Sequence, residues 1–265
     1  MPINRPMERD TDADSALSLG GRVALVTGAA AGIGRACVER FLDDGCHVVA
    51  LESDVSAAKG LEEDLSEAVG TVVACQGDAT VEDDVRAAVA MALERWRRLD
   101  VLVNAAGGFT ESPAFEAEEP GTWERLVNLN LTSAYLCCRE VLPAMKRAGF
   151  GRIVNISSMS GRTAVPNTSH AYSAAKAGML GLTRSLALEV APAGITVNAV
   201  APGVVMTPRI SVLHAARMDE LRAATPVGRL GEPSDIADAV WYLARPVTSY
   251  MTGAVLDLNG GRFMA

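Results

Sequence analysis

Short apolar runs alternate with longer amphipathic stretches along most of the chain. The runs are rich in Val, Ile, Leu and Ala and predict buried strands at residues 22–27, 47–51, 71–75, 100–103, 152–156, 195–200 and 254–258. Apolar positions spaced three and four apart predict helices at residues 32–44, 54–69, 81–96, 122–147, 171–190 and 233–244. Strands that are apolar on both faces and alternate with helices indicate a parallel sheet covered on both sides.

Right-handed crossovers arrange such a chain as a doubly wound, Rossmann-type α/β sheet of about seven parallel strands. We expect one domain over residues 20–265, because no polar linker or internal repeat divides this stretch. Residues 1–19 are charged and without periodicity, which predicts a mobile N-terminal tail.

Composition narrows the function classes. The chain has 265 residues, of which 49% are hydrophobic, enough for a large core, and its net charge of −8 argues against a nucleic-acid or acidic-membrane binder. Five cysteines without a CxxC pair, and only three histidines, argue against a metal site and favour reduced thiols. Neither a secretory leader nor an apolar span suited to a membrane is visible, so we expect a cytoplasmic protein.

Glycines recur at Gly28, Gly32 and Gly34, between the first predicted strand and the first predicted helix. Glycine lets the backbone turn tightly and approach a pyrophosphate closely. The helix that begins there presents unpaired N–H groups and the positive end of its dipole to the phosphates. In this strand–loop–helix context the motif predicts a dinucleotide-binding site.

Acidic residues follow the second and third predicted strands. Glu52 stands about twenty residues after the loop, where a carboxylate binds the adenosine ribose hydroxyls and repels a 2′-phosphate. The loop has Ala31 before Gly32 and no basic residue, so NAD is favoured over NADP. The alternative is that Glu52 is a solvated strand end, with Asp54 as a helix N-cap. Asp78 either accepts a hydrogen bond from the adenine or caps the helix that starts near residue 81.

Tyr172 and Lys176 lie four apart in a predicted helix, so their side chains project from the same face. An unperturbed tyrosine has a pKa near 10 and is a poor base at neutral pH. A neighbouring ammonium stabilises the phenolate and lowers that pKa. Ser158, at the end of the fifth predicted strand, can donate a hydrogen bond to a reacting oxygen. The three residues predict general acid–base chemistry at an alcohol or carbonyl.

With these motifs in place, residues 20–261 resemble the short-chain dehydrogenase/reductase family, in its single-domain branch. Further shared segments are residues 104–107 (Asn-Ala-Ala-Gly), 127–131 around Asn130, 198–203 and 253–261. Ala105 stands where the family usually has a second asparagine. Ser158 is one residue further from the tyrosine than in many relatives, which leaves Ser157 open as an alternative.

The resemblance implies the role of each residue. Tyr172 would be the general acid/base, Lys176 would lower its pKa and bind the nicotinamide ribose, and Ser158 would polarise the carbonyl. Asn130 would hold a water that links Lys176 to solvent. Cofactor binding would involve Tyr172 and Lys176 together with Thr27, Gly28, Gly32, Ile33, Gly34, Glu52, Asp78, Ala79, Asn104, Ala105, Gly107, Pro202, Gly203, Val205 and Thr207.

The family resemblance also implies a reaction: NAD(H)-dependent hydride transfer between a secondary alcohol and a ketone, without a metal. The alternatives are a 3-oxoacyl-thioester reductase acting on acyl-carrier-protein or CoA substrates, and a noncatalytic NAD-binding sensor or scaffold. A substrate lid is expected near residues 204–226 and a homotetramer is favoured. Five side chains have two alternative interpretations, contact with an anionic substrate or exposure on a solvated surface: Arg162, Arg209, His214, Arg217 and Arg222.

Overall fold

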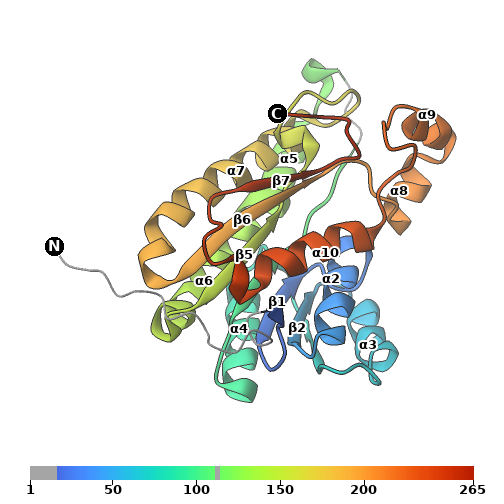
Figure 1. Cartoon of the computed structure of the whole chain (residues 1–265). Coiled ribbons are helices and arrows are strands. Elements are labelled where there is room, and N and C mark those ends of the chain that lie inside the picture. The colour runs from blue at the N-terminus through green and yellow to red at the C-terminus, as the bar shows by residue number, and fades with distance from the viewer. Residues whose placement is uncertain (1–16, 111–113) are drawn as a thin grey trace.

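A computed structural model describes residues 17–110 and 114–265, and within them a single parallel sheet of seven strands runs through the molecule (Figure 1). The strands are β1 (Val23–Thr27), β2 (His47–Glu52), β3 (Val72–Gln76), β4 (Val101–Asn104), β5 (Gly151–Ile156), β6 (Ile195–Pro202) and β7 (Val255–Leu258). Their spatial order is β3-β2-β1-β4-β5-β6-β7, which confirms the Rossmann-type sheet predicted from the apolar runs.

Helices cover both faces of the sheet (Figure 1). The longer ones are α2 (Gly32–Asp43), α3 (Val55–Asp64), α4 (Glu82–Trp96), α6 (Ser133–Ala148), α7 (His170–Val190) and α10 (Pro233–Ala244). Alternate residues of β1 face opposite ways: Ala24 and Val26 pack with α2 and α10, whereas Val23 and Leu25 pack with α4, α6 and α7. Burial on both faces explains why the strands are apolar without alternation.

The order of the strands reverses between β1 and β4, which are neighbours in the sheet. The chain leaves β1 towards β2 through α2, and it leaves β4 towards β5 through α6. The connections after β1 and β4 therefore diverge, and a crevice opens beyond the carboxyl ends of these strands. Ligands of doubly wound sheets bind in this crevice.

The helical region predicted over residues 122–147 is confirmed, but it contains a π-helical turn that the sequence did not indicate. It consists of α5 (Pro120–Val127), a π-helical segment (Asn128–Thr132) and α6. The hydroxyl of Ser133 donates to the carbonyl of Leu129 at 2.7 Å within this irregular turn. A π-helical turn inserts one residue without altering the apolar character of its neighbours, so periodicity does not show it.

The folded domain also begins before residue 20, where the sequence placed its start. Leu19 is completely buried in the core, its backbone N–H donates to the Asp44 carboxylate at 2.7 Å, and the hydroxyl of Ser18 donates to the same side chain at 3.0 Å. Residues 18–19 thus belong to the folded unit. Residues 1–16 of the predicted tail lie outside the described residues.

All five cysteines are buried and hold free thiols. Burial raises the pKa of Cys37 and of Cys138 to about 12. In the described part of the chain, no group of three or more His, Cys, Asp or Glu side chains is arranged to hold a metal ion. No helix among the described residues is long and apolar enough to cross a membrane.

Candidate active site

The loop between β1 and α2 is folded so tightly that only glycine fits at key positions. Gly28 has φ +61°, and a Cβ there would lie 3.0 Å from the Cα of Ala106. A Cβ on Gly34, in the first turn of α2, would collide with the carbonyl oxygen of Gly28. These contacts fix the path of the loop and bring the start of α2 close to the crevice.

Helix α2 begins without a side-chain cap. Its N-cap residue is Ala31, which makes no capping hydrogen bond, and its first turn contains no acidic residue. In α3, by contrast, the Asp54 carboxylate accepts a hydrogen bond from the N–H of Ala57 at 2.9 Å, as the sequence predicted for this N-cap. The open N–H groups of α2 fit the pyrophosphate of a dinucleotide.

The carboxylate of Glu52 lies against this loop. One oxygen accepts a hydrogen bond from the N–H of Ala30 at 3.1 Å, and the other accepts from the N–H of Asp54 at 3.1 Å. The acid is therefore fixed between the loop and the end of β2, not free in solvent. Its proposed contact with ribose hydroxyls stays a prediction.

Asp78 closes the turn that precedes α4. One of its oxygens accepts hydrogen bonds from the N–H and the hydroxyl of Thr80, both at 2.8 Å. The N-cap of α4 is Val81, so the alternative of Asp78 as the cap of this helix is wrong. The predicted adenine contacts of Asp78 and the adjacent Ala79 remain predictions.

Two polar residues predicted to bind cofactor lie buried at the floor of the crevice. The hydroxyl of Thr27 accepts hydrogen bonds from the N–H groups of Ala105 at 3.1 Å and Ala106 at 2.9 Å, which ties the ends of β1 and β4 together. Asn104 donates to Asn155 at 2.8 Å, while its Oδ1 is buried with no hydrogen-bond partner in the described chain. A buried acceptor of this kind suits a donor on a bound molecule.

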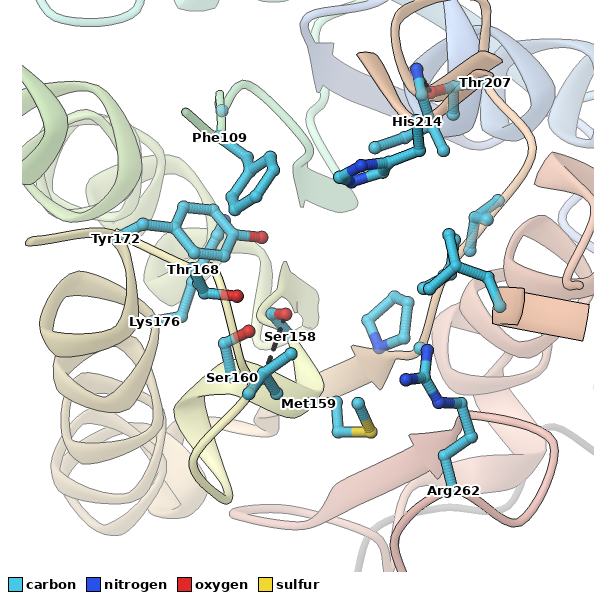
Figure 2. Close-up of a pocket in the computed structure, with 18 of the residues that line it drawn as sticks. Phe109, Ser158, Met159, Ser160, Thr168, Tyr172, Lys176, Thr207, His214 and Arg262 are labelled. Atoms are coloured by element: carbon cyan, nitrogen blue, oxygen red, sulfur yellow. Dashed lines mark hydrogen bonds between the residues drawn. The ribbon is translucent and has the colours of Figure 1, made fainter. Parts of the chain in front are cut away.

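Beyond the carboxyl ends of β5 and β6 lies a cavity of about 360 Å³, where Ser158, Tyr172 and Lys176 come together (Figure 2). Ser158 follows β5 and Tyr172 lies in the first turn of α7. The hydroxyl of Ser158 acts to lower the pKa of Tyr172. The hydroxyl of Ser157 instead donates to the carbonyl of Lys176 at 2.9 Å, so Ser158 is the serine presented to Tyr172.

The electrostatics of this group differ from the prediction. Burial raises the pKa of Tyr172, while the hydroxyl of Ser158 and the positive charge of Arg209 act to lower it. Lys176 is not among the groups that act on this pKa. Its Nζ donates to the carbonyl of Ile156 at 2.8 Å and lies 5.7 Å from the centre of the Tyr172 ring. Burial lowers the pKa of Lys176 itself to about 7, so much of its charge is lost at neutral pH.

Asn130 lies in the π-helical segment and is completely buried. Its amide accepts from the N–H of Gly108 at 3.1 Å and donates to the carbonyls of Gly108 at 2.9 Å and Leu126 at 3.0 Å. A Cβ on Gly107 would lie 2.9 Å from Oδ1 of Asn130 and 3.3 Å from Nζ of Lys176. Asn130 thus holds the segment after β4 beside Lys176, and the water proposed there stays a prediction.

Most of the predicted nicotinamide-side residues line the same cavity: Ile33, Ala105, Gly107, Pro202, Gly203, Val205 and Thr207. Others do not line it and lie along the loop and strand ends: Thr27, Gly28, Gly32, Gly34, Glu52, Asp78, Ala79 and Asn104. The structure therefore divides the predicted set into a loop region and a cavity region.

Two short helices, α8 (Pro208–Leu213) and α9 (Met218–Ala223), form the segment where a lid was expected. Arg209 donates to the carbonyl of Phe109 at 2.7 Å. Two other candidates are engaged in ion pairs, Arg222 with Asp219 at 2.8 Å and Arg162 with Asp257 at 2.9 Å. Among the five candidates for substrate contact, only His214 and Arg217 line the cavity.

Sequence reasoning missed Phe109, Thr168 and Arg262, which also line the cavity (Figure 2). The ring of Phe109 meets that of Tyr172 edge-on, with centroids 5.5 Å apart. Arg262 comes from the chain after β7. No spacing or periodicity marks a single basic residue at this position, because only the fold brings it to the cavity.

The family model described as Enoyl-(Acyl carrier protein) reductase matches residues 28–262. The chain belongs to the short-chain dehydrogenase/reductase family. As a member of the short-chain dehydrogenase/reductase family, it is an oxidoreductase that binds a nicotinamide cofactor.

Two relatives in this family and one solved structure illustrate the similarity. An acetoacetyl-CoA reductase from Allochromatium vinosum is 38% identical over 92% of this chain and 99% of its own length. A cis-4-hydroxycyclohexanecarboxylate dehydrogenase from Sinomonas cyclohexanicum is 39% identical over 91% of this chain and 96% of its own. A Beutenbergia cavernae protein assigned as an NAD(P)-dependent gluconate 5-dehydrogenase, with NADP at low occupancy, is 36% identical, with a TM-score of 0.86 over 93% of this chain and 98% of its own.

Proposed function

We propose that the protein interconverts a secondary alcohol and a ketone, with NAD(H) as the cofactor. The observation that carries this proposal is that Ser158 and Tyr172 line one cavity, where the Ser158 hydroxyl acts to lower the pKa of Tyr172 (Figure 2). The uncapped start of α2 fits the pyrophosphate, and Ile33, Pro202 and Thr207 line the region where the nicotinamide would lie. When bound, the nicotinamide supplies or accepts the hydride.

The side chains of the cavity do the remaining work. Ser158 donates a hydrogen bond to the substrate oxygen and orients it. The hydroxyl of Tyr172 gives its proton to that oxygen during ketone reduction, and the phenolate takes it back during alcohol oxidation. The nearby charge of Arg209 favours the phenolate of Tyr172. Because burial lowers the pKa of Lys176 to about 7, this side chain can exchange a proton near neutral pH.

Changing Tyr172 to Phe tests this role. We expect kcat to fall by about 10²- to 10⁴-fold, the usual contribution of a general acid–base group, while NAD binding changes little. Turnover is followed by NADH absorbance and binding by calorimetry. Tyr242→Phe, on the exposed face of α10, is the matched control and should retain activity. Substantial turnover by Tyr172→Phe would overturn the proposed chemistry.

The preference for NAD rests on Glu52, whose carboxylate is fixed next to the loop at the N–H of Ala30. A 2′-phosphate brought to this place would meet a negative charge. The bound NADP in the Beutenbergia structure shows that a relative takes the phosphorylated cofactor, so the ratio of affinities must be measured in this protein. We expect NAD to bind at least about tenfold tighter than NADP, and Glu52→Gln to narrow that ratio.

Glu67→Gln is the control for charge, because Glu67 is exposed and lies in the turn between α3 and β3. It should leave the cofactor ratio as it is. A wild-type preference for NADP would overturn the assignment of Glu52.

A 3-oxoacyl-thioester reductase is the second candidate, favoured by the similarity to acetoacetyl-CoA reductase. The similarity to cis-4-hydroxycyclohexanecarboxylate dehydrogenase favours a small alcohol instead. Turnover of acetoacetyl-CoA compared with that of small secondary alcohols separates the two. A noncatalytic NAD-binding protein would bind the cofactor and turn over neither class.

We also propose a cytoplasmic homotetramer with a substrate lid at residues 204–226. Large apolar side chains stand exposed on helices that could pair, with Tyr135 of α6 at 48% and Leu188 of α7 at 83% exposure. Light scattering on the purified protein measures the assembly directly. A monomer at micromolar concentration would contradict the tetramer.

A further inference from the structure

Arg262 brings a positive charge into the cavity from the opposite side to the reacting hydroxyls. It follows β7, and its guanidinium points into the space across from Ser158 and Tyr172 (Figure 2). Its Nη1 is buried and has no hydrogen-bond partner in residues 17–110 and 114–265. A buried cationic donor without a partner is costly, so this group is suited to an anion that comes from outside the chain.

The nearest acid does not satisfy Arg262. Glu220, on α9, lines the same cavity, and the pKa of its carboxyl is lowered mainly by Arg217 and to a smaller extent by the charge of Arg262. Both oxygens of Glu220, however, accept hydrogen bonds from Arg217, each at 3.0 Å. No hydrogen bond joins Glu220 to Arg262 in the described chain, so the fork of Arg262 is left for another carboxylate or phosphate.

The charge of the lining points the same way. The arginines that line the cavity are Arg217 and Arg262, whereas Glu220 is the one acidic residue among the described residues that line it. This positive surplus lies inside a chain whose net charge is −8. The apolar side chains that line the cavity include those of Met159 and Leu221. The cavity therefore suits a molecule with a short apolar body and an anionic end.

We infer that Arg262 binds the anionic group, carboxylate or phosphate, of a substrate whose alcohol or ketone carbon lies at Ser158 and Tyr172. This rests on the proposed function and gives its substrate class: small hydroxy or oxo acids. A guanidinium pairs with either anion through two parallel N–H donors. Arg262 is a specificity-determining residue that holds the far end of the substrate while the hydroxyls act on the near end.

The test compares matched ketones in NADH-dependent reduction. The probes are 4-oxopentanoate and 5-oxohexanoate, their uncharged methyl esters, and the phosphonate analogue of each acid. For the preferred acid, we expect the wild-type protein to show a kcat/KM at least about tenfold higher than for its ester, and Arg262→Met to remove most of that ratio. Arg262→Lys should restore only part of it, because an ammonium lacks the planar fork. Preference for the phosphonate over the carboxylate would identify the anion as a phosphate.

Arg147→Met is the control, since Arg147 is exposed near the end of α6 and its loss changes the net charge equally. It should leave the acid-to-ester ratio unchanged. An equal effect of Arg262→Met on acid and ester, or a wild-type protein that prefers the ester, would overturn the inference while the proposed reaction stands.

A binding experiment separates failure of this inference from failure of the proposed function. Calorimetry on Tyr172→Phe with NADH bound measures affinity for the same acids without turnover. Binding that is lost in the Tyr172→Phe/Arg262→Met double variant supports the anion site even if the wild-type protein reduces none of the ketones. Equal binding by the two variants would contradict it.

Discussion

Helices α2 and α10 pack against each other on one face of the sheet, yet they begin in opposite ways (Figure 1). At the N-terminus of α10, nearby residues of the chain satisfy the backbone hydrogen-bonding groups. Pro233 at its first position has no N–H to satisfy, and the Asp235 carboxylate accepts from the N–H of Glu232 at 2.8 Å and pairs with Arg229 at 2.6 Å. Helix α2 starts at Ala31 with no side-chain cap and no acid in its first turn.

This difference is the one expected between a helix end that stabilises the fold and one that binds a ligand, the role we propose for α2. Satisfying the first N–H groups of a helix internally stabilises it by about 0.5–2 kcal/mol. Helix α2 forgoes this stabilisation at the crevice between β1 and β4, where an anion is expected. We therefore propose that the unsatisfied end of α2 binds the pyrophosphate, whereas the neighbouring α10 begins with its own side-chain contacts.

The largest expected effect comes from closing the space in front of α2. Gly34→Ala places a methyl group into the carbonyl oxygen of Gly28, so the loop must shift away from its position. We expect NAD binding to fall below detection and the free energy of unfolding to drop by about 2–3 kcal/mol, as for other strained core substitutions. Calorimetry and thermal unfolding measure the two effects.

The matched control for that change is Gly60→Ala, within α3, where a Cβ would meet no atom within 4 Å. Alanine should stabilise this helix by about 0.5–1 kcal/mol and leave NAD binding alone. NAD binding by Gly34→Ala at wild-type strength would show that the close approach to Gly28 is not needed.

A smaller effect is expected from giving α2 the kind of N-cap carboxylate that Asp54 provides for α3. Ala31 is exposed and its backbone is extended, with φ −145° and ψ 161°, as an N-cap requires. Ala31→Asp should stabilise the cofactor-free protein by about 1 kcal/mol. It should also weaken NAD binding by about tenfold, because its carboxylate competes with the pyrophosphate for the same N–H groups.

Ala31→Ser provides the uncharged comparison, since a hydroxyl caps the helix without repelling phosphate. Its effect on NAD affinity should be smaller than that of Ala31→Asp. Equal NAD affinity in all three proteins would mean that the start of α2 does not contact the cofactor.

The smallest expected effect concerns another incompletely satisfied group, the ammonium of Lys176, whose one hydrogen bond in the described chain goes to Ile156. Burial lowers its pKa in the folded state to about 7, well below the unfolded value. The unfolded chain therefore binds more protons above pH 7, and stability rises with pH there. Relative to Lys176→Met, we expect the cofactor-free protein to gain on the order of 1 kcal/mol between pH 7 and 8.

Denaturant unfolding of the two proteins at a series of pH values measures this difference. The subtraction removes the contribution of groups common to both. A difference that stays flat from pH 6 to 9 would mean that the Lys176 ammonium keeps its ordinary pKa despite burial.

The sequence predicted the parts of the molecule whose signals are local. Strand positions, the glycine loop and the Asp54 cap each depend on residues close together in the chain, and the structure has them where they were expected. The pattern of apolar residues did not predict the π-helical turn that contains Asn130. Arg262 was missed because it reaches the cavity only through the folding of the sheet, far from the other site residues in sequence.

The pKa of Tyr172 shows a further limit. The four-residue spacing of Tyr172 and Lys176 correctly predicted that both side chains face one cavity. That spacing does not predict their burial or the carbonyl of Ile156 that binds the ammonium. The energetic coupling of two neighbours depends on the atoms packed around them, which come from several distant segments.

The five buried thiols are expected to react slowly with thiol reagents in the native protein. Only a thiolate reacts quickly with alkylating reagents, and burial keeps these groups protonated and out of reach. Labelling of Cys37 and Cys138, which lie on opposite faces of the sheet, therefore requires the core to open. The rate of alkylation at each cysteine therefore reports how often the native core opens on that face of the sheet, and mass spectrometry measures it without an engineered probe.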